Sequence, residues 1–580
     1  MDTLNKLKFL NARMNRRKDP MDTHSLARYW LEHATDPEIL SELKELTAPD
    51  KAQELEDAFF QELSFGTAGL RGVLGAGTNR MNIYTVGKAT QGLANYLVGA
   101  FDEPTVAIAR DSRNKGELFV RTTATILAAM GIHVHIFPRI EPVPALSFAV
   151  RELETSAGIV MTASHNPAPY NGYKVYGPDG CQITSEAAEA ISAAIALVDP
   201  FTGVKTGDFD EFMEAGVIDW IDDVVLDRFL DAELANSQDD PDAADVSLKL
   251  VYTPLCGSGL ELNSRLFERI GVKDVTVVPE QKEPDGNFPT CPYPNPEIRE
   301  AMQKGIECCE RVHPDLLLAT DPDADRCGVA VKADDDYLLL TGNEMGILML
   351  DYLCKMHEKK GDLPEGAIAV STIVSTAMID AIAERYGVSI RRTLTGFKYI
   401  GEIINELVDA GHPERFLLGF EESYGYLAAT HVRDKDSISA SMVICQMAQH
   451  YKLHGMNLAQ AIRALYEEYG YYRNKTVSIS FPGAQGSTKM ANIMEGLRER
   501  PLTEFAGRTV VDVVDYREGS AGLPPADVIE CRLADENKVI FRPSGTEPKI
   551  KAYLFGKAAS ASEAKATIEE LETAARTVLS

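Results

Sequence analysis

A serine at the end of an apolar strand is the first residue in this sequence that could carry chemistry. The apolar residues 157–161 are followed by the string Thr-Ala-Ser-His-Asn-Pro at 162–167. The helix-breaking Asn-Pro pair predicts a rigid turn that presents Ser164 outward, where its hydroxyl could act as a nucleophile or carry a phosphoryl group. His165 could assist by proton transfer or hydrogen bonding. A Ser-His pair alone is more often only a turn, but a strand followed by this string is more specific.

Three aspartates at alternate positions form the second candidate site. Asp321, Asp323 and Asp325 follow the apolar residues 316–319, and Arg326 comes directly after them. Carboxylates at this spacing can converge on one hard cation, and oxygen ligands suit Mg²⁺. An acidic surface turn is the alternative, but crowded like charges are costly without a cation. The pattern resembles the opening of a calcium-binding EF-hand loop but lacks its glycine and its final glutamate.

A third loop, Gly-Phe-Glu-Glu-Ser-Tyr-Gly at 419–425, follows the apolar residues 416–418. Glu421 and Ser423 in this loop could hydrogen-bond vicinal hydroxyls of a sugar, because a carboxylate accepts from two hydroxyls at once. Taken alone, this loop is weak evidence for a sugar-binding site.

A fourth loop, Arg-Pro-Ser-Gly-Thr-Glu-Pro-Lys at 542–549, is rich in donors. The fork of Arg542, the hydroxyls of Ser544 and Thr546, and the backbone amides beside Gly545 could surround a phosphate group. A plain hairpin loop is the alternative. The two prolines and the density of donors favour an anion site.

The elements that must position these loops alternate between strands and helices. Strands are predicted at 105–109, 133–137, 157–161, 248–252, 275–278, 316–319, 367–370 and 416–418. Helical patterns cover 25–60, 117–130, 377–386, 399–409 and 437–451. This alternation predicts parallel α/β layers, in which chemistry collects at the carboxyl ends of the strands. The tail differs, because strands at 528–533, 538–542 and 549–554 and a helix from 560 predict a small α+β domain.

Composition narrows the class of protein. The chain has 580 residues, and this length suggests about four domains. Its 58 basic and 87 acidic residues give a formal charge of −29, which argues against nucleic-acid partners and against a polybasic membrane surface. Nine scattered cysteines suggest reduced thiols, and no apolar run approaches the ~18 residues of a membrane span. A cytoplasmic protein is expected.

The four loops, in this order, resemble those of the α-D-phosphohexomutase superfamily. The similarity is greatest to phosphoglucomutase and phosphomannomutase proteins of the longer subgroup related to phosphopentomutases, and it covers the chain from about residue 59 to the C-terminus. Three further strings carry it: Phe-Gly-Thr-Ala-Gly-Leu-Arg-Gly at 65–72, Thr-Gly-Phe-Lys at 395–398 and Val-Arg-Asp-Lys-Asp at 432–436.

The resemblance implies a role for each matching residue. Ser164 corresponds to the phosphorylated serine, which also contributes an oxygen to Mg²⁺ beside Asp321, Asp323 and Asp325. The catalytic group implied by the resemblance also contains Arg71, His165, Lys174 and Lys398. The implied substrate-binding residues are Glu421, Ser423, Arg542, Ser544, Gly545, Thr546 and Arg326.

The implied fold is α/β, with three α/β domains of mixed sheets and a C-terminal α+β domain around a central cleft. We expect an N-terminal helical extension at 1–45 and domains at 46–210, 211–325, 326–465 and 466–580. Met-Asp-Thr at 21–23 repeats the opening Met-Asp-Thr at 1–3. Residues 1–20 are therefore expected to be dispensable.

The implied activity is interconversion of glucose 1-phosphate and glucose 6-phosphate through phosphoserine, with glucose 1,6-bisphosphate as intermediate and activator. Mannose, pentose and bisphosphate-synthase activities remain alternatives. A non-catalytic regulatory homologue is disfavoured, because the serine, the three aspartates and Arg542 are all present. The expected partner is a small phosphosugar, and the chain is expected to be a monomer or a homodimer.

Overall fold

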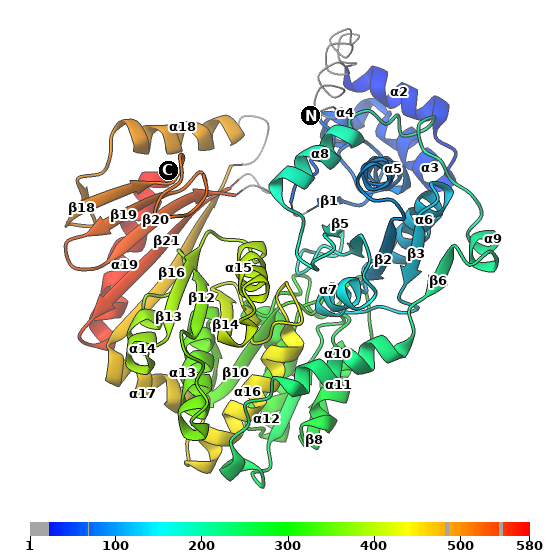
Figure 1. Cartoon of the computed structure of the whole chain (residues 1–580). Coiled ribbons are helices and arrows are strands. Elements are labelled where there is room, and N and C mark those ends of the chain that lie inside the picture. Colours follow the sequence, from blue (N-terminus) through cyan, green and yellow to red (C-terminus); the bar gives the residue numbers. More distant parts are fainter. Residues whose placement is uncertain (1–21, 68, 482–485, 545–548) are drawn as a thin grey trace.

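The computed structural model describes residues 22–67, 69–481, 486–544 and 549–580 (Figure 1). The expectation for residues 1–20 and the placement of Gly545 and Thr546 lie outside the described residues. Figure 1 shows the first unit and the tail unit on opposite sides at the top, with two further units below. The nine cysteines are free and buried. Within the described residues, no helix combines the length and the apolar character needed to cross a bilayer.

The N-terminal segment forms three short helices rather than the single helix predicted at 25–60. These are α2 (Thr23–His33), α3 (Pro37–Leu46) and α4 (Ala52–Phe59). Asp36 caps α3 with its side chain, and Pro37 stands in the first turn, so the chain must start a new helix there. The three helices pack around the buried side chain of Trp30.

The first sheet has the strand order β1-β5-β4-β2-β3-β6. Its strands are β1 (Leu70–Val73), β2 (Thr105–Arg110), β3 (His133–Ile136), β4 (Ala157–Met161), β5 (Tyr170–Tyr176) and β6 (Ile218–Trp220). Strands β4, β2, β3 and β6 are parallel, and β5 runs antiparallel to β4. Its helices are α5 (Ile83–Ala100), α6 (Gly116–Ala129), α7 (Val143–Glu152), α8 (Ser185–Ile195) and α9 (Phe209–Glu214).

The second sheet has the order β11-β10-β9-β7-β8, and the third has the order β13-β12-β14-β15. The second contains β7 (Lys249–Thr253), β8 (Asp274–Val277), β9 (Leu316–Thr320), β10 (Cys327–Ala333) and β11 (Asp336–Leu340). The third contains β12 (Ile368–Thr372), β13 (Ser389–Thr393), β14 (Phe416–Glu421) and β15 (Gly425–Leu427). The helices of this region are α10 (Asp223–Ala235), α11 (Leu260–Arg269), α12 (Arg299–Val312), α13 (Gly342–Lys360), α14 (Met378–Tyr386), α15 (Lys398–Asp409), α16 (Ser437–Leu453) and α17 (Leu458–Tyr469). One apolar core joins the two sheets through α13 and α16.

The three α/β units share one connection that matters for the site. In each, a buried parallel strand is followed by a loop and then by an antiparallel neighbour: β4 by β5, β9 by β10, and β14 by β15. These three loops are the serine, aspartate and glutamate loops singled out in the sequence. Equivalent positions in three related sheets therefore carry the candidate chemistry.

The tail forms an antiparallel sheet with the order β16-β21-β20-β19-β18-β17, which confirms the predicted α+β unit. Its strands are β16 (Tyr471–Ser480), β17 (Glu504–Phe505), β18 (Arg508–Asp515), β19 (Ile529–Leu533), β20 (Lys538–Pro543) and β21 (Lys549–Ala558). Helices α18 (Gly486–Glu499) and α19 (Ala561–Leu579) pack on it.

The predicted domain boundaries at 211 and 326 cut through two of these sheets. Strand β6 belongs to the first sheet, and β10 and β11 belong to the second. The antiparallel hairpin is the physical reason, because a strand that turns back on β9 stays in the same sheet as β9. Helix α17 likewise continues to Tyr469, past the boundary expected at 466. We propose divisions after Trp220, Leu340 and Tyr469.

Candidate active site

Ser164 lies buried where the first and second units meet. Its hydroxyl donates a hydrogen bond to Asp321 Oδ2 at 2.7 Å, although the two residues are 157 positions apart. His165 Nδ1 lies 3.1 Å from Ser164 Oγ. Ser164 has φ of 51°, in the left-handed region that costs free energy for a residue with a Cβ. The loop must therefore be held in this conformation by its surroundings.

Arg113 supplies much of that support. Its Nη1 donates to the carbonyls of Pro167 (3.0 Å) and Tyr170 (2.9 Å). Its Nη2 donates to the carbonyls of Ser164 (2.5 Å) and Asn166. One guanidinium thus binds four main-chain oxygens of the serine loop, in a side chain with no exposed area.

Sequence reasoning missed Arg113, although a signal was present. The residue follows β2, which is the parallel neighbour of β4, so it comes to the same sheet edge as Ser164. Asp111 Oδ2 lies 3.4 Å from Arg113 Nε and 2.6 Å from the hydroxyl of Thr162. Burial raises the pKa of Asp111 to about 6, while Arg113 opposes that rise.

The three aspartates converge as the sequence predicts. Asp321, Asp323 and Asp325 are buried, and one oxygen of each lies within 4.8 Å of the others. Asp321 Oδ1 accepts from the backbone amides of Asp325 (3.2 Å) and Arg326 (3.1 Å). Ala324 has φ of 48°, which turns the chain back on itself so that the carboxylates face inward.

The donor set fits a hard divalent cation. Within the described residues, Asp323 Oδ1 and Asp325 Oδ1 are buried without a hydrogen-bond partner, and such oxygens are costly unless a cation or donor meets them. Burial and the neighbouring Asp323 and Asp325 raise the pKa of Asp321 well above its ordinary value. All the converging atoms are oxygens, which is the ligand set that Mg²⁺ prefers.

Cations surround the acidic cluster. Lys174 Nζ lies 2.8 Å from Asp323 Oδ2 and 3.4 Å from Asp325 Oδ2. Lys435 Nζ lies 3.0 Å from Asp325 Oδ2, and sequence reasoning had given it no role. Burial would raise the pKa of Asp325, but Lys435, Lys174 and Arg326 together hold it below its ordinary value. Asp325 therefore remains a carboxylate.

His165 belongs to the serine loop and Arg71 contacts it, whereas Lys398 lies apart from it. Arg71 Nη1 donates to Asn166 Oδ1 at 3.0 Å. Burial lowers the pKa of His165 well below its ordinary value, and the nearby Arg326 and Arg71 act in the same direction, so its imidazole is neutral. Lys398 Nζ instead lies 3.4 Å from the hydroxyl of Ser185, at the start of α8.

The glutamate loop is joined to the aspartate loop through the backbone. Arg326 forms an antiparallel bridge with Gly425, and the amide of Cys327 donates to the carbonyl of Tyr424 at 3.1 Å. Glu421 Oε1 accepts from the amide of Gly396 at 2.7 Å. Ser423 lies in the turn between β14 and β15, so the second and third loops share one rigid frame.

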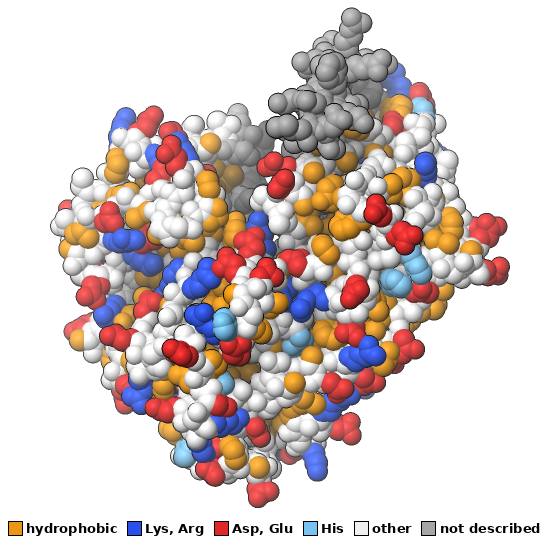
Figure 2. Space-filling view, viewed as in Figure 1, with side chains coloured by type: hydrophobic (Ala, Val, Ile, Leu, Met, Phe, Trp, Pro, Cys, Tyr) orange, Lys and Arg blue, Asp and Glu red, His pale blue; other side chains and the backbone are white. Residues whose placement is uncertain are grey.

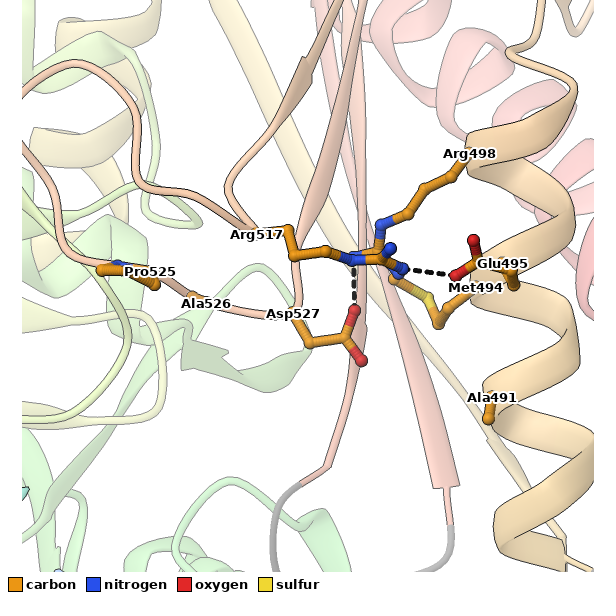
Figure 3. Close-up of a pocket in the computed structure, with 8 residues that line it drawn as sticks. All are labelled: Ala491, Met494, Glu495, Arg498, Arg517, Pro525, Ala526 and Asp527. Carbon is orange, nitrogen blue, oxygen red and sulfur yellow. Dashed lines mark hydrogen bonds and ion pairs between the residues drawn. The ribbon is translucent and has the colours of Figure 1, made fainter.

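Arg542 and Ser544 lie where the tail sheet meets the third unit. They line a hollow of about 400 Å³ together with residues Ile373, Leu394, Thr395, Tyr399, Ala526, Asp527, Val528 and Pro543. A second hollow of about 380 Å³ lies beside it, between α18 and the loop before β19 (Figure 3). There Arg498 pairs with Asp527 and Arg517 pairs with Glu495, so both arginines already face carboxylates.

Comparison with known proteins agrees with this arrangement. Residues 62–200, 227–334 and 341–469 match domains I, II and III of the family described as phosphoglucomutase/phosphomannomutase, alpha/beta/alpha. A phosphoglucomutase of Staphylococcus haemolyticus is 36% identical over 511 residues, which is 86% of this chain and 91% of that protein. The chain belongs to the phosphoglucomutase/phosphomannomutase family.

Other members extend the similarity across the family. A phosphoglucomutase of Staphylococcus saprophyticus is 34% identical over 540 residues, covering 90% of this chain and 95% of its own. The crystal structure of a phosphoglucomutase/phosphomannomutase family protein from Burkholderia thailandensis has a TM-score of 0.65 at 19% identity, covering 89% and 97% of the two chains. That structural likeness shows the family fold in this chain.

Proposed function

We propose that this chain is a phosphoglucomutase that interconverts glucose 1-phosphate and glucose 6-phosphate through phosphorylated Ser164. The observation that carries the proposal is the hydrogen bond from the Ser164 hydroxyl to Asp321, within a buried triad of aspartates. The Staphylococcus relatives named phosphoglucomutase support the choice of sugar. Mannose and pentose phosphates are alternatives that the assay below distinguishes.

Asp321, Asp323, Asp325 and an oxygen of Ser164 would hold Mg²⁺. When bound, the cation neutralises negative charge that develops on the transferred phosphoryl group, which is the main requirement of phosphoryl transfer. The chain's own cations add to this effect. Lys174 and Lys435 lie against the triad, and Arg71 lies against the serine loop.

In the proposed first step, the bond from phosphorus to Ser164 Oγ breaks and a bond to the free 6-hydroxyl of glucose 1-phosphate forms. The sugar hydroxyl loses its proton and Ser164 Oγ is protonated again, so the step balances. Glucose 1,6-bisphosphate is the product of this step. After the bisphosphate reverses its orientation, its 1-phosphoryl group returns to Ser164 and glucose 6-phosphate leaves.

The other loops position the sugar. We propose that Glu421 and Ser423 accept and donate hydrogen bonds at the sugar hydroxyls, and that Arg542, Ser544, Gly545 and Thr546 hold the phosphate that does not react. Arg326 would contact the substrate beside the triad, and Lys398 would contact it from the start of α15. These contacts are remote from the phosphorus atom that reacts. They lower the activation barrier by orienting the reacting end of the substrate.

The test is a coupled assay in which product glucose 6-phosphate is oxidised by its dehydrogenase, with a trace of glucose 1,6-bisphosphate present. Ser164→Ala should lose most turnover and should no longer take up a phosphoryl group, as measured by intact mass. Ser156→Ala is the matched control, because Ser156 comes just before β4, at the end opposite Ser164, and its hydroxyl accepts from the amide of Thr105 (3.3 Å). Wild-type turnover in Ser164→Ala would refute the proposal.

Metal dependence and sugar preference are measured in the same assay. Chelation should abolish turnover and added Mg²⁺ should restore it. Full activity after exhaustive chelation would contradict the proposed role of the triad. Higher kcat/KM with mannose 1-phosphate or ribose 1-phosphate than with glucose 1-phosphate would reassign the sugar while leaving the phosphoserine mechanism intact.

A further inference from the structure

A second group of metal-ligand side chains lies outside the active site, at the edge of the first sheet. His133 and His135 are two residues apart on β3, so both side chains project from the same face of the sheet. Strand β6 pairs with β3 in parallel, and its register sets Asp219 opposite His135. Val134, Ile136 and Ile218 on the other face are buried in the core.

The three side chains converge at short range. His133 Nε2 lies 2.7 Å from Asp219 Oδ2, and His135 Nδ1 lies 2.7 Å from Asp219 Oδ1. The two imidazole rings are stacked, with centroids 4.5 Å apart and planes inclined by 25°. The ligand atoms of the three residues all lie within 4.8 Å of one another.

The cluster is open to solvent. The side chains of His133 and Asp219 are 42% and 45% exposed, and that of His135 is 21% exposed. Figure 2 shows histidine side chains on the molecular surface over the region of β3 and β6 in Figure 1. A hydrated ion can therefore reach the group without any opening of the fold.

The charge of Asp219 distinguishes this cluster from another group of similar composition. Within the described residues, Asp219 has no lysine or arginine partner, and its two oxygens meet only the two imidazoles. In the group of Asp240, His450 and His454, the carboxylate of Asp240 already pairs with Lys359. A cation at Asp240 would have to displace that ammonium group.

We propose that His133, His135 and Asp219 bind one divalent transition-metal cation, for which Zn²⁺ is the appropriate probe. Two imidazoles and one carboxylate are ligands that Zn²⁺ accepts readily, whereas Mg²⁺ prefers oxygen ligands only. The site would therefore select a different class of metal from the aspartate triad of the active site. Three protein ligands leave a position for water.

The geometry needs little adjustment to admit the ion. Ligand atoms about 2.0–2.1 Å from one Zn²⁺ at tetrahedral angles lie about 3.3 Å from each other. The two contacts of 2.7 Å are made to different oxygens of Asp219, so rotation of the exposed side chains must widen them by about half an ångström and bring both nitrogens and one oxygen to this spacing. His133 would coordinate through Nε2 and His135 through Nδ1.

The consequence would be a cross-link at a weak point of the sheet. Strand β6 has three residues and, among the residues that the structure describes, pairs with β3 alone, at the edge of the sheet. It is followed directly by α10, which leads the chain into the second unit. A metal bound by residues of both β3 and β6 would stabilise the pairing of these two strands, and it would do so outside the active site.

The experiment titrates the full chain with Zn²⁺ by calorimetry, with Mg²⁺ in large excess so that the active-site triad is occupied. The wild-type chain should bind one equivalent of Zn²⁺, with a rise in melting temperature. His135→Gln and Asp219→Asn should each weaken this binding by at least about tenfold, since loss of groups that merely orient metal ligands already costs ~10–100-fold. Titration with Co²⁺ should give visible absorption bands in the wild type that the variants lack.

His450→Gln is the matched control and should keep the Zn²⁺ equivalent, because it removes one histidine from the other group. His133→Gln, at the more exposed of the two imidazoles in the cluster, provides a second test if His135→Gln does not fold. Mutase turnover should be unchanged in all of these variants. Zn²⁺ binding of equal affinity and stoichiometry in wild type, His135→Gln and His133→Gln would overturn the proposal, as would the absence of any Zn²⁺ equivalent in the wild type.

Discussion

Replacement of Arg113 by lysine should test whether the serine loop is held from outside. The change keeps the positive charge but removes the planar fork that binds the carbonyls of Ser164, Asn166, Pro167 and Tyr170. A single ammonium group cannot reach four oxygens spread along seven residues of loop. At least two of the four hydrogen bonds should therefore be lost.

The size of the effect follows from those bonds. Hydrogen bonds to a charged group contribute about 1.5–3 kcal/mol each, so the loss of two predicts about 3–6 kcal/mol of destabilisation in the first unit. Ser164 has a left-handed φ of 51°, so a loosened loop should relax away from this conformation. A displacement of about 1 Å at a reacting group can cost roughly 100-fold in rate, and we expect a fall in kcat of that order. KM should change little, because Arg542 and Ser544, the described residues of the proposed phosphate site, lie in the tail.

The assay measures kcat and KM for glucose 1-phosphate, together with thermal unfolding and the phosphorylation of Ser164 by intact mass. Arg110→Lys is the matched control, because Arg110 ends β2, three residues before Arg113, and its ion pair with the exposed Glu117 is long, at 3.8 Å. That variant should behave as wild type, since exposed ion pairs contribute about 0–1 kcal/mol. Wild-type kcat and melting temperature in Arg113→Lys would refute the reasoning.

Three further changes probe other parts of the molecule. Arg542→Lys should raise KM and lower kcat/KM by roughly 10–100-fold, since lysine lacks the fork for two phosphate oxygens; unchanged steady-state kinetics would place the phosphate elsewhere. Lys174→Met should abolish turnover and cost about 3–5 kcal/mol, because it leaves buried carboxylates without their ion pair; equal melting curves would contradict this. Burial raises the pKa of Glu233, which faces His431 and Asp436, to about 7. The folded state favours the protonated form of Glu233, so its contribution to the free energy of unfolding is complete below about pH 4.5. Roughly 3 kcal/mol of that contribution is lost as the pH rises to 7. In denaturation measured as a function of pH, Glu233→Gln should flatten this part of the stability profile.

The strands and loops that carry the candidate chemistry were predictable because their signals are local. The predicted strand at 157–161 coincides with β4, and the run before Asp321 falls in β9. A buried parallel strand reads as a continuous apolar run, and the polar turn after it marks the sheet edge. The meeting of Ser164 with the aspartates of a different sheet was expected only from the family resemblance, because no local signal specifies how the two sheets pack.

The supporting groups were only partly predictable. The position of Arg113 after β2 places it at the same sheet edge as Ser164, but the partners of its side chain depend on contacts between distant segments. Arg113 meets the Ser164 carbonyl across 51 positions, and Lys435 reaches Asp325 from a different unit. Lys398 was expected with the catalytic groups, but its Nζ contacts Ser185 on the first unit. The strings at 395–398 and 432–436 contain Lys398 and Lys435, but the partners of these side chains are set only when the sheets pack together.

The four loops differ in how firmly they are joined, and this difference bears on the proposed mechanism. The Ser164 hydroxyl connects the serine loop to the aspartate loop by a hydrogen bond, and Lys174, on the strand after the serine loop, does so by an ion pair. The aspartate loop is connected to the glutamate loop by the β-bridge between Arg326 and Gly425. The tail contacts the third unit through a separate apolar cluster that includes Ile373 and Phe555. The groups that would transfer the phosphoryl group thus form one connected frame. Arg542 and Ser544, which would help to hold the other phosphate, lie instead at the end of a strand of the tail sheet. A bisphosphate that must reverse its orientation without leaving needs a fixed reacting end and a holder that can release and rebind it. This arrangement also explains why changes at Arg113 should act on kcat and changes at Arg542 should act on KM as well.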